Sequence, residues 1–139
     1  MQHETGARWL RLDWQNRISE PLAINGPAVR QIALNLLLNA CAASPPGGLV
    51  IVTASCSDAM LRITVADEGP GLPEDMAALL DQSVRGTAPP PESKGLGLWM
   101  TGQLIRRLDG RADVEYPRVG TRVVVILPVF LKEVLDAAA

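Results

Sequence analysis

Three neutral amide side chains recur at helical spacing early in the chain. Gln31, Asn35 and Asn39 are four residues apart, so they share one stripe of a helix. Asparagine is a poor helix former because its side chain competes for backbone hydrogen bonds, and two of them in mid-helix indicate a specific role. An amide oxygen can coordinate a hard cation such as Mg²⁺, and an amide nitrogen can donate to a phosphate oxygen. An ordinary polar helix face is the alternative interpretation.

A carboxylate followed by two glycines forms the second cluster. Asp67 ends an apolar, strand-like run, and Gly69 and Gly71 follow at alternate positions. Glycine permits a tight turn and lets a flat ligand lie close to the backbone. At that place the Asp67 carboxylate can accept a hydrogen bond from an exocyclic amine. A plain turn between a strand and a helix also explains these residues.

The third cluster is Lys94-Gly95-Leu96-Gly97-Leu98, where a segment rich in glycine, proline and small residues gives way to a helical pattern. Backbone N–H groups at the start of a helix bind anions, and glycine allows a phosphate to approach them. Alone, such a glycine pair is a weak signal, and a simple loop-to-helix junction is the alternative.

The elements that must position these clusters follow from the hydrophobic pattern. Asn25-Gly26-Pro27 is typical of a helix start, and Pro45 stops that helix. Alternating or β-branched apolar runs predict strands, and the remaining periodic segments predict helices. The strands cover residues 9–14, 49–54, 60–66, 112–116 and 121–127, with a short extended piece at 21–24, and the helices cover 27–44, 73–82 and 96–108. Because strands and helices do not alternate regularly, we expect an α/β (α+β) two-layer sandwich, a mixed sheet of about five strands with about three helices on one face.

Composition narrows the class of protein. The chain has 139 residues, 47% of them hydrophobic, which fits one domain with a substantial core. A net charge of −2 gives no basic excess for nucleic acid or a membrane surface. His3 is the single histidine, which excludes a histidine-cluster metal site. The uncharged stretch 31–57 contains two asparagines and a Pro-Pro-Gly-Gly breaker and cannot span a bilayer, and no signal peptide is visible, so we expect a cytoplasmic domain.

The order and spacing of the three clusters together resemble the ATP-binding catalytic domain of sensor histidine kinases, within the wider family of DNA gyrase, Hsp90-type chaperones and mismatch-repair ATPases. The segment NLLLNA at 35–40 is similar to the family's N box, Asp67-x-Gly69-x-Gly71 to its G1 box, and GLGL at 95–98 to its G2 box. The likeness covers roughly residues 10–129 and implies the Bergerat-type ATP-binding fold.

The resemblance implies ATP and Mg²⁺ as ligands and a role for each matching residue. Asn39 would hold the Mg²⁺ that bridges the triphosphate, and Asn35 would support the phosphates from one turn earlier. Asp67 would accept the adenine amino group, and Gly69 and Gly71 would shape the adenine pocket.

The same resemblance assigns the segment from Gly95 through Leu98, including Leu96, to nucleotide binding, with Gly95 and Gly97 as hinges of a lid over the phosphates at residues 86–94. Arg85 and Lys94 are candidate phosphate contacts, and each is equally compatible with a solvated surface charge.

Four positions depart from the pattern of these kinases. Ala42 and Ala43 stand where many of them have a Lys and a Tyr, and Leu80 and Ser83 stand where a phenylalanine pair is expected. A phosphate contact, an aromatic wall and the packing of the lid are therefore in question.

The mechanism implied by the resemblance is phosphoryl donation and not hydrolysis. The gyrase-like relatives have a water-activating glutamate where this chain has Asn35, and an amide cannot take a proton at neutral pH. The nucleophile would be a histidine on a helical hairpin domain of the same parent kinase, and a response regulator would receive the phosphoryl group indirectly. We expect a linker remnant at residues 1–8, which includes His3, the catalytic domain at 9–129 and a tail at 130–139.

Two other functions fit the same residues. A serine kinase of the anti-sigma-factor type shares the fold and can be a free-standing domain of this size. A nucleotide-binding module without transfer activity is the other alternative, and the four departures from the pattern motivate it.

Overall fold

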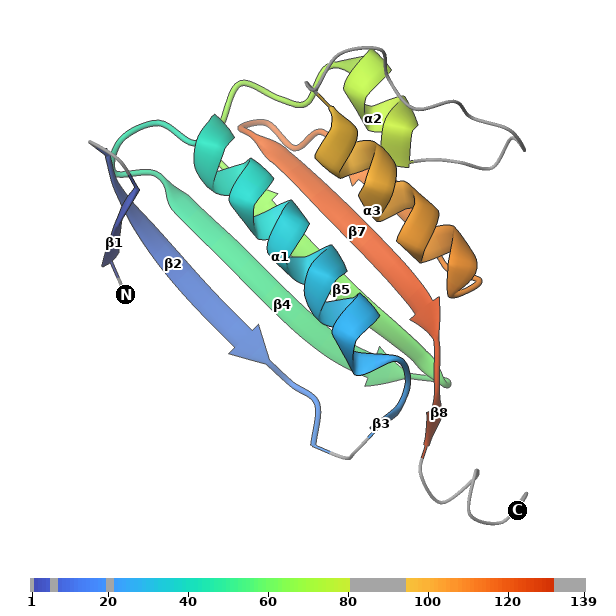
Figure 1. The fold of residues 1–139 in the computed structure, drawn as a ribbon. Helices are drawn as coiled ribbons and strands as arrows, with labels where there is room; N and C mark the ends of the chain where they lie inside the picture. The colour runs from blue at the N-terminus through green and yellow to red at the C-terminus, as the bar shows by residue number, and fades with distance from the viewer. Residues whose placement is uncertain (1, 6–7, 20–21, 81–94, 132–139) are drawn as a thin grey trace.

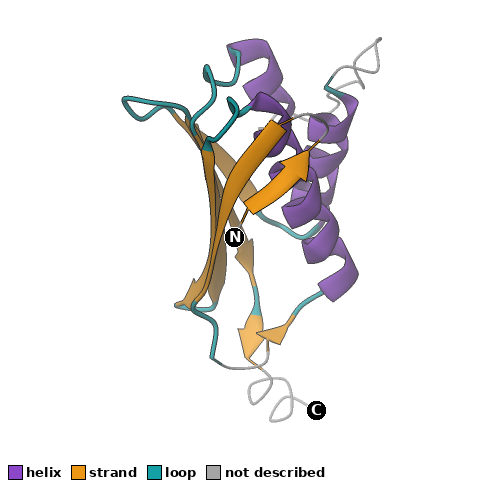
Figure 2. Cartoon of the chain, turned by 90° about the vertical axis from the view of Figure 1, so that its left-hand side faces the viewer, coloured by secondary structure: helices purple, strands orange, loops and turns teal. Residues whose placement is uncertain are grey.

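The computed structural model describes residues 2–5, 8–19, 22–80 and 95–131, which form a sheet covered by helices (Figure 1). The strands are β1 Gln2–Thr5, β2 Arg8–Asn16, β3 Leu22–Ala23, β4 Leu49–Ser57, β5 Met60–Asp67, β6 Arg111–Glu115, β7 Thr121–Pro128 and β8 Phe130–Leu131. The helices are α1 Gly26–Ala43, α2 Glu74–Leu80 and α3 Leu96–Arg107. All three lie on the same side of the sheet, as the view in Figure 2 shows, so the described part of the chain has two layers.

The main sheet is mixed, in the order β1-β2-β4-β5-β7-β6. β2 and β4 are parallel, whereas every other neighbouring pair in this sheet is antiparallel. A parallel pair needs a crossover connection, and the segment containing α1 supplies it. The predicted five-stranded mixed sheet with three helices on one face is confirmed, and β1 extends that sheet at one edge.

Short strands lie in both segments that the sequence predicts to be outside the domain. The sequence predicts a linker at residues 1–8, but Gln2–Thr5 is strand β1, paired with the start of β2. It also predicts a tail from residue 130, but β8 pairs with β3. Such short edge strands are held by backbone pairing, which leaves no alternating apolar pattern in the sequence. Residues 132–139, the rest of that tail, lie outside the described residues.

α1 begins and ends where its sequence predicts. The Asn25 side chain caps it by accepting a hydrogen bond from the Ala28 backbone N–H at 3.1 Å, and Ser44 ends it before Pro45. Its buried residues are Ile32, Leu36 and Ala40, four apart. The amide stripe precedes each of these by one residue, about 100° around the helix, and therefore lies at the border of the buried face.

The core fills the space between the helices and the central strands. Its strand residues include Val50, Val52, Leu61, Ile63, Val65, Val123, Val125 and Leu127, which alternate along β4, β5 and β7. Within the described residues, no helix combines the length and apolar character that crossing a bilayer requires.

Candidate functional site

A cavity of about 330 Å³ lies between the second half of α1, the loop after β5 and the start of β7. Asn39 and Asp67, from the first and second sequence clusters, both line it. Most of its other lining residues are apolar: Leu36, Ala40, Val65, Pro70, Leu72, Pro73, Met76 and Val123. An apolar recess with a few convergent polar groups is the usual form of a small-ligand site.

The part of this cavity nearest the end of α1 is lined by Ala42 and Ala43. Both small side chains leave that wall without a charge or an aromatic ring. The structure thus places the two departures from the kinase pattern directly at the cavity.

Asp67, the last residue of β5, is half-buried at the cavity wall. Its Oδ1 accepts a hydrogen bond from the Gly69 backbone N–H at 2.8 Å. Burial raises the pKa of the Asp67 carboxyl above its ordinary value, and backbone hydrogen bonds from Gly69 and Thr121 oppose part of that rise. A partly desolvated carboxylate attracts a donor more strongly than one in bulk water, because the local dielectric is lower.

The two glycines after Asp67 are required by the structure for different reasons. A Cβ on Gly69 would lie 2.7 Å from the Ala43 carbonyl oxygen, so this glycine lets the loop pack against the end of α1. Gly71 has φ +97°, a left-handed conformation that L side chains rarely adopt. Each glycine therefore fits the backbone of this loop, and Gly71 lines the cavity.

Two side chains outside the three sequence clusters hold this loop in place. Thr121 Oγ1 accepts a hydrogen bond from the Leu72 backbone N–H at 2.9 Å, and the Tyr116 hydroxyl donates to the Leu72 carbonyl at 2.7 Å. Thr121 is buried beside Asp67 in the strand register. In the sequence, the Gly120-Thr121 pair before the last long strand could have indicated the role of Thr121. No sequence feature indicated the role of Tyr116.

The third cluster forms the start of α3. Gly95 is its N-cap, with φ +87° and no side-chain capping bond, and a Cβ there would lie 2.8 Å from Leu79 Cδ1. Leu98 is buried and anchors the turn, whereas Leu96 is exposed. Around Gly97, a Cβ would meet no described residue within 4 Å. Packing among the described residues therefore requires Gly95 but not Gly97, and none of these residues covers the Gly97 side of the first turn of α3.

Asn35 connects the first cluster to the third. Its Nδ2 donates to Thr101 Oγ1 of α3 at 3.0 Å, and its Oδ1 accepts from Gln31 Nε2 at 2.8 Å. Asn39, one turn later, has no side-chain hydrogen bond to any of the described residues. The two asparagines thus differ: one is bonded into the framework, and the other presents its amide at the cavity.

The structure brings four of the predicted site residues together. Asn39, Asp67 and Gly71 line one cavity, and Gly95 adjoins it through Met76, whose sulfur would lie 3.2 Å from a Cβ at Gly95. Arg85, Lys94 and the predicted lid at 86–94 lie outside the described residues.

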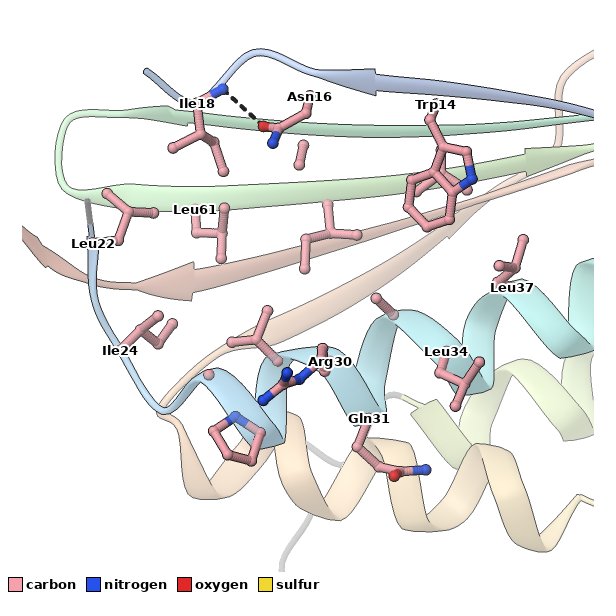
Figure 3. A pocket seen from close by; sticks show the side chains of 17 residues that line it. Trp14, Asn16, Ile18, Leu22, Ile24, Arg30, Gln31, Leu34, Leu37 and Leu61 are labelled. Atoms are coloured by element: carbon pink, nitrogen blue, oxygen red, sulfur yellow. Dashed lines mark hydrogen bonds between the residues drawn. The ribbon is translucent and has the colours of Figure 1, made fainter. Parts of the chain in front are cut away.

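A larger cavity of about 790 Å³ lies on the other side of α1, toward β2 and β4 (Figure 3). Trp14 and Leu34 line it and are 53% and 48% exposed. Arg30 is the one charged residue among its described lining residues, and no carboxylate is among them. The smaller cavity is therefore the better candidate for a nucleotide site, since it alone combines Asp67 with a cluster amide.

Comparisons with known proteins show the family of this chain. The family model for histidine kinase-, DNA gyrase B-, and HSP90-like ATPase matches residues 24–131. The chain is 38% identical over 121 residues to the histidine protein kinase DivJ of Caulobacter vibrioides and 30% identical over 112 residues to sporulation kinase A of Bacillus subtilis. These alignments cover 79% and 78% of this chain but 19% and 18% of the relatives, so the chain spans about a fifth of their length.

Solved structures show the same relationship. The mycobacterial sensor histidine kinase MprB matches with a TM-score of 0.68 at 27% identity, over 88% of this chain and 83% of that one. Full-length ShkA in complex with AMPPNP matches with a TM-score of 0.68 at 28% identity, over 88% of this chain and 26% of that one. The nucleotide-free catalytic domain of the histidine kinase ThkA, at 20% identity, supports the fold alone, with a TM-score of 0.69 over 86% of this chain and 78% of that one. On the family match and the shared fold, the chain belongs to the histidine kinase-, DNA gyrase B- and HSP90-like ATPase family.

Proposed function

We propose that this domain binds ATP with Mg²⁺ and donates the γ-phosphoryl group to a histidine on a separate hairpin domain of its parent kinase, in two-component signalling. One observation carries the proposal: a single cavity has Asp67 and Asn39 in its wall, and Met76 of the same wall lies against Gly95 at the start of α3. The named histidine kinases among its relatives support the reaction class, and AMPPNP in the ShkA structure supports the ligand class.

The Asp67 end of the cavity fits adenine. An ionised carboxylate accepts hydrogen bonds only, and the exocyclic amine of adenine is a donor. Leu72, Met76 and Val123 supply apolar walls for a flat ring. The loop that carries Gly69 and Gly71 brings backbone close to that ring.

The Asn39 side chain fits a magnesium ligand. Its amide has no partner among the described residues, it lies at the cavity, and carbonyl-type oxygen is a donor that Mg²⁺ accepts. Mg²⁺ usually takes one or two protein oxygens and fills its remaining positions with water and phosphate, so a single amide is sufficient. When bound, the ion would neutralise charge on the phosphates.

The phosphate end would be formed by the start of α3. Its backbone N–H groups and the helix dipole favour an anion, and Gly97 leaves room for one. We keep Arg85 and Lys94 as proposed phosphate contacts. Asn35 would support the phosphates indirectly, by holding α1 in place, since its amide already donates to Thr101.

The charges around the cavity favour transfer over hydrolysis. Asp67 is the one carboxylate among its described lining residues, and it stands at the proposed adenine end. No general base for water is therefore present among those residues near the phosphates. Phosphoryl transfer needs mainly positioning and charge neutralisation, which amides, helix-end dipoles and a metal supply. The acceptor would come from the partner hairpin, and a response regulator would follow it in the relay.

The experiment is calorimetric titration of ATP and ADP with and without Mg²⁺. Asn39→Ala should remove the Mg²⁺ dependence of ATP binding while ADP affinity without metal remains. Leu38→Ala, at the exposed neighbouring position, is the matched control for a general effect on α1 and should bind as wild type. Equal losses with and without metal in Asn39→Ala would contradict the metal role.

A second experiment separates the three possible activities. Incubated with a histidine hairpin and ATP, the domain should give acid-labile, base-stable phosphate on histidine. An acid-stable phosphoserine product would support the serine kinase instead, and ATP binding without any transfer would support the binding module.

A further inference from the structure

A chain of hydrogen bonds runs between the two helices that carry the proposed site. Gln31 donates to Asn35 Oδ1, and Asn35 Nδ2 donates to Thr101 Oγ1 at 3.0 Å. The Thr101 hydroxyl in turn donates to the Gly97 carbonyl of α3 at 2.7 Å. Each group donates to the next in one direction, an arrangement in which neighbouring hydrogen bonds strengthen each other.

Thr101 occupies a position where the pattern of α3 calls for an apolar residue. It is fully buried, with 0% exposure, on the same face as Leu98 and Ile105. A buried hydroxyl needs a partner, and its bond to the Gly97 carbonyl within the helix already provides one. Thr101 therefore does not need the contact with Asn35 to satisfy its hydroxyl. It holds the amide of Asn35 across 66 residues of sequence.

The positions of Asn35 and Gly97, the two bonding partners of Thr101, connect this contact with the proposed site. Asn35 lies one turn before Asn39 on α1, and Gly97 lies in the first turn of α3. α1 and α3 lie side by side (Figure 1). One buried hydroxyl thus touches both the helix of the proposed metal ligand and the turn of the proposed phosphate site.

We propose that Thr101 is a positioning residue for the triphosphate, holding the Asn35 amide and the first turn of α3 in fixed register. This inference rests on the proposed nucleotide function. Thr101 is proposed to touch no ligand itself; it acts through its bond with Asn35, which ties α1 to the first turn of α3. Its loss should therefore weaken binding of the triphosphate and leave binding of the adenine ring unchanged.

The test compares Thr101→Val, which removes the hydroxyl, with Thr101→Ser, which keeps it and removes the methyl group. Titrations of the 139-residue chain use ATP with Mg²⁺ and, separately, adenosine. We expect Val to weaken ATP binding by roughly 3- to 10-fold, the effect of one net hydrogen bond, with adenosine affinity unchanged. Thr101→Ser should stay within about twofold of wild type for both ligands.

A double-mutant cycle checks the route of the effect. In an Asn35→Ala background, Thr101→Val should cause no further loss of ATP affinity, because the contact is already absent. Additive losses would overturn the inference.

The remaining outcomes are equally decisive. Equal losses for ATP and adenosine, or equal losses in the Val and Ser variants, would assign Thr101 to core packing and overturn the inference. So would an ATP affinity of Thr101→Val equal to that of wild type. If the wild-type chain bound neither ligand, the proposed function itself would fail, which the variants are not needed to reveal.

Discussion

Asp67 shows how a proposed ligand-binding group can oppose the stability of the fold. Burial raises the pKa of its carboxyl, so the folded state holds the Asp67 proton to a higher pH than the unfolded chain does. The stabilisation from this group is therefore fully present below the unfolded-state pKa and is lost as the pH rises through the folded-state pKa. At pH 7 the ionised carboxylate lowers stability relative to a neutral group in the same place.

The Asp67→Asn variant separates the effect of the Asp67 charge on stability from its effect on ligand affinity. Its free energy of unfolding at pH 7, measured in urea, should equal or exceed that of wild type, because the amide avoids the buried charge and its oxygen can still accept from the Gly69 N–H. Its affinity for adenosine should fall by about 1.5–3 kcal/mol, the scale of a hydrogen bond to a charged group. An unchanged dissociation constant would refute the adenine role, and a large loss of stability would refute the electrostatic argument.

The Gly97→Ala variant tests whether this glycine serves a ligand. A Cβ there meets no described residue within 4 Å, so the domain without ligand should be as stable as wild type or more stable by up to about 1 kcal/mol, because alanine favours a helix. ATP affinity should fall at least about fivefold, roughly 1 kcal/mol, with adenosine unaffected.

Gly95→Ala is the matched control for that prediction. Its φ of +87° and its contact with Leu79 should make it less stable without any ligand. If Gly97→Ala bound ATP as wild type does, the close approach of phosphate to α3 would be excluded.

At the scale of elements, the connection between β4 and β5 has a strained turn remote from the site. Asp58 and Ala59 are its two residues, with φ of 53° and 58°, and the pairs on either side continue the ladder. Two consecutive left-handed residues are the mark of a type I′ hairpin, which favours glycine at the second position. Alanine there is disfavoured by contact of its Cβ with the following carbonyl.

Ala59→Gly should therefore raise the free energy of unfolding by about 1 kcal/mol without changing ATP affinity. Ala78→Gly, at an exposed position of α2, is the matched control and should lower it, since glycine weakens a helix interior. Urea unfolding of wild type, Ala59→Gly and Ala78→Gly measures both changes in the free energy of unfolding. A destabilised Ala59→Gly would contradict the turn geometry.

At the scale of the whole molecule, the proposed site exists only when the chain is folded. Its walls come from α1, the loop after β5, the start of β7 and α2, which are distant in sequence. A ligand that binds the folded state alone stabilises all of it by mass action.

ATP with Mg²⁺ at a hundredfold excess over its dissociation constant should raise the free energy of unfolding by about 2.7 kcal/mol. Thermal unfolding followed by tryptophan fluorescence reports this shift. Asp67→Asn at the same ATP concentration should show a much smaller shift. A wild-type unfolding temperature insensitive to ATP would contradict a site confined to the folded state.

What the sequence by itself determined was local. The start of α1 at Asn25 and the three motif clusters, with the turn glycines Gly69 and Gly71, depend on interactions between neighbouring residues, so short-range sterics and hydrogen bonding encode them in the local sequence. The order of these clusters was enough to indicate the family and the two-layer fold.

Only the tertiary structure decided the contacts between distant residues. The hydrogen bonds between Thr101 and Asn35 and between Tyr116 and Leu72 form only after packing has placed the helices and strands beside each other. The sequence around one partner therefore does not reveal the other. β1 and β8 escaped prediction for a related reason, since backbone pairing at an edge requires no particular side chains. The physical division is between interactions within a few residues, which composition and spacing encode, and interactions across the fold, whose partners are chosen by the geometry of the core.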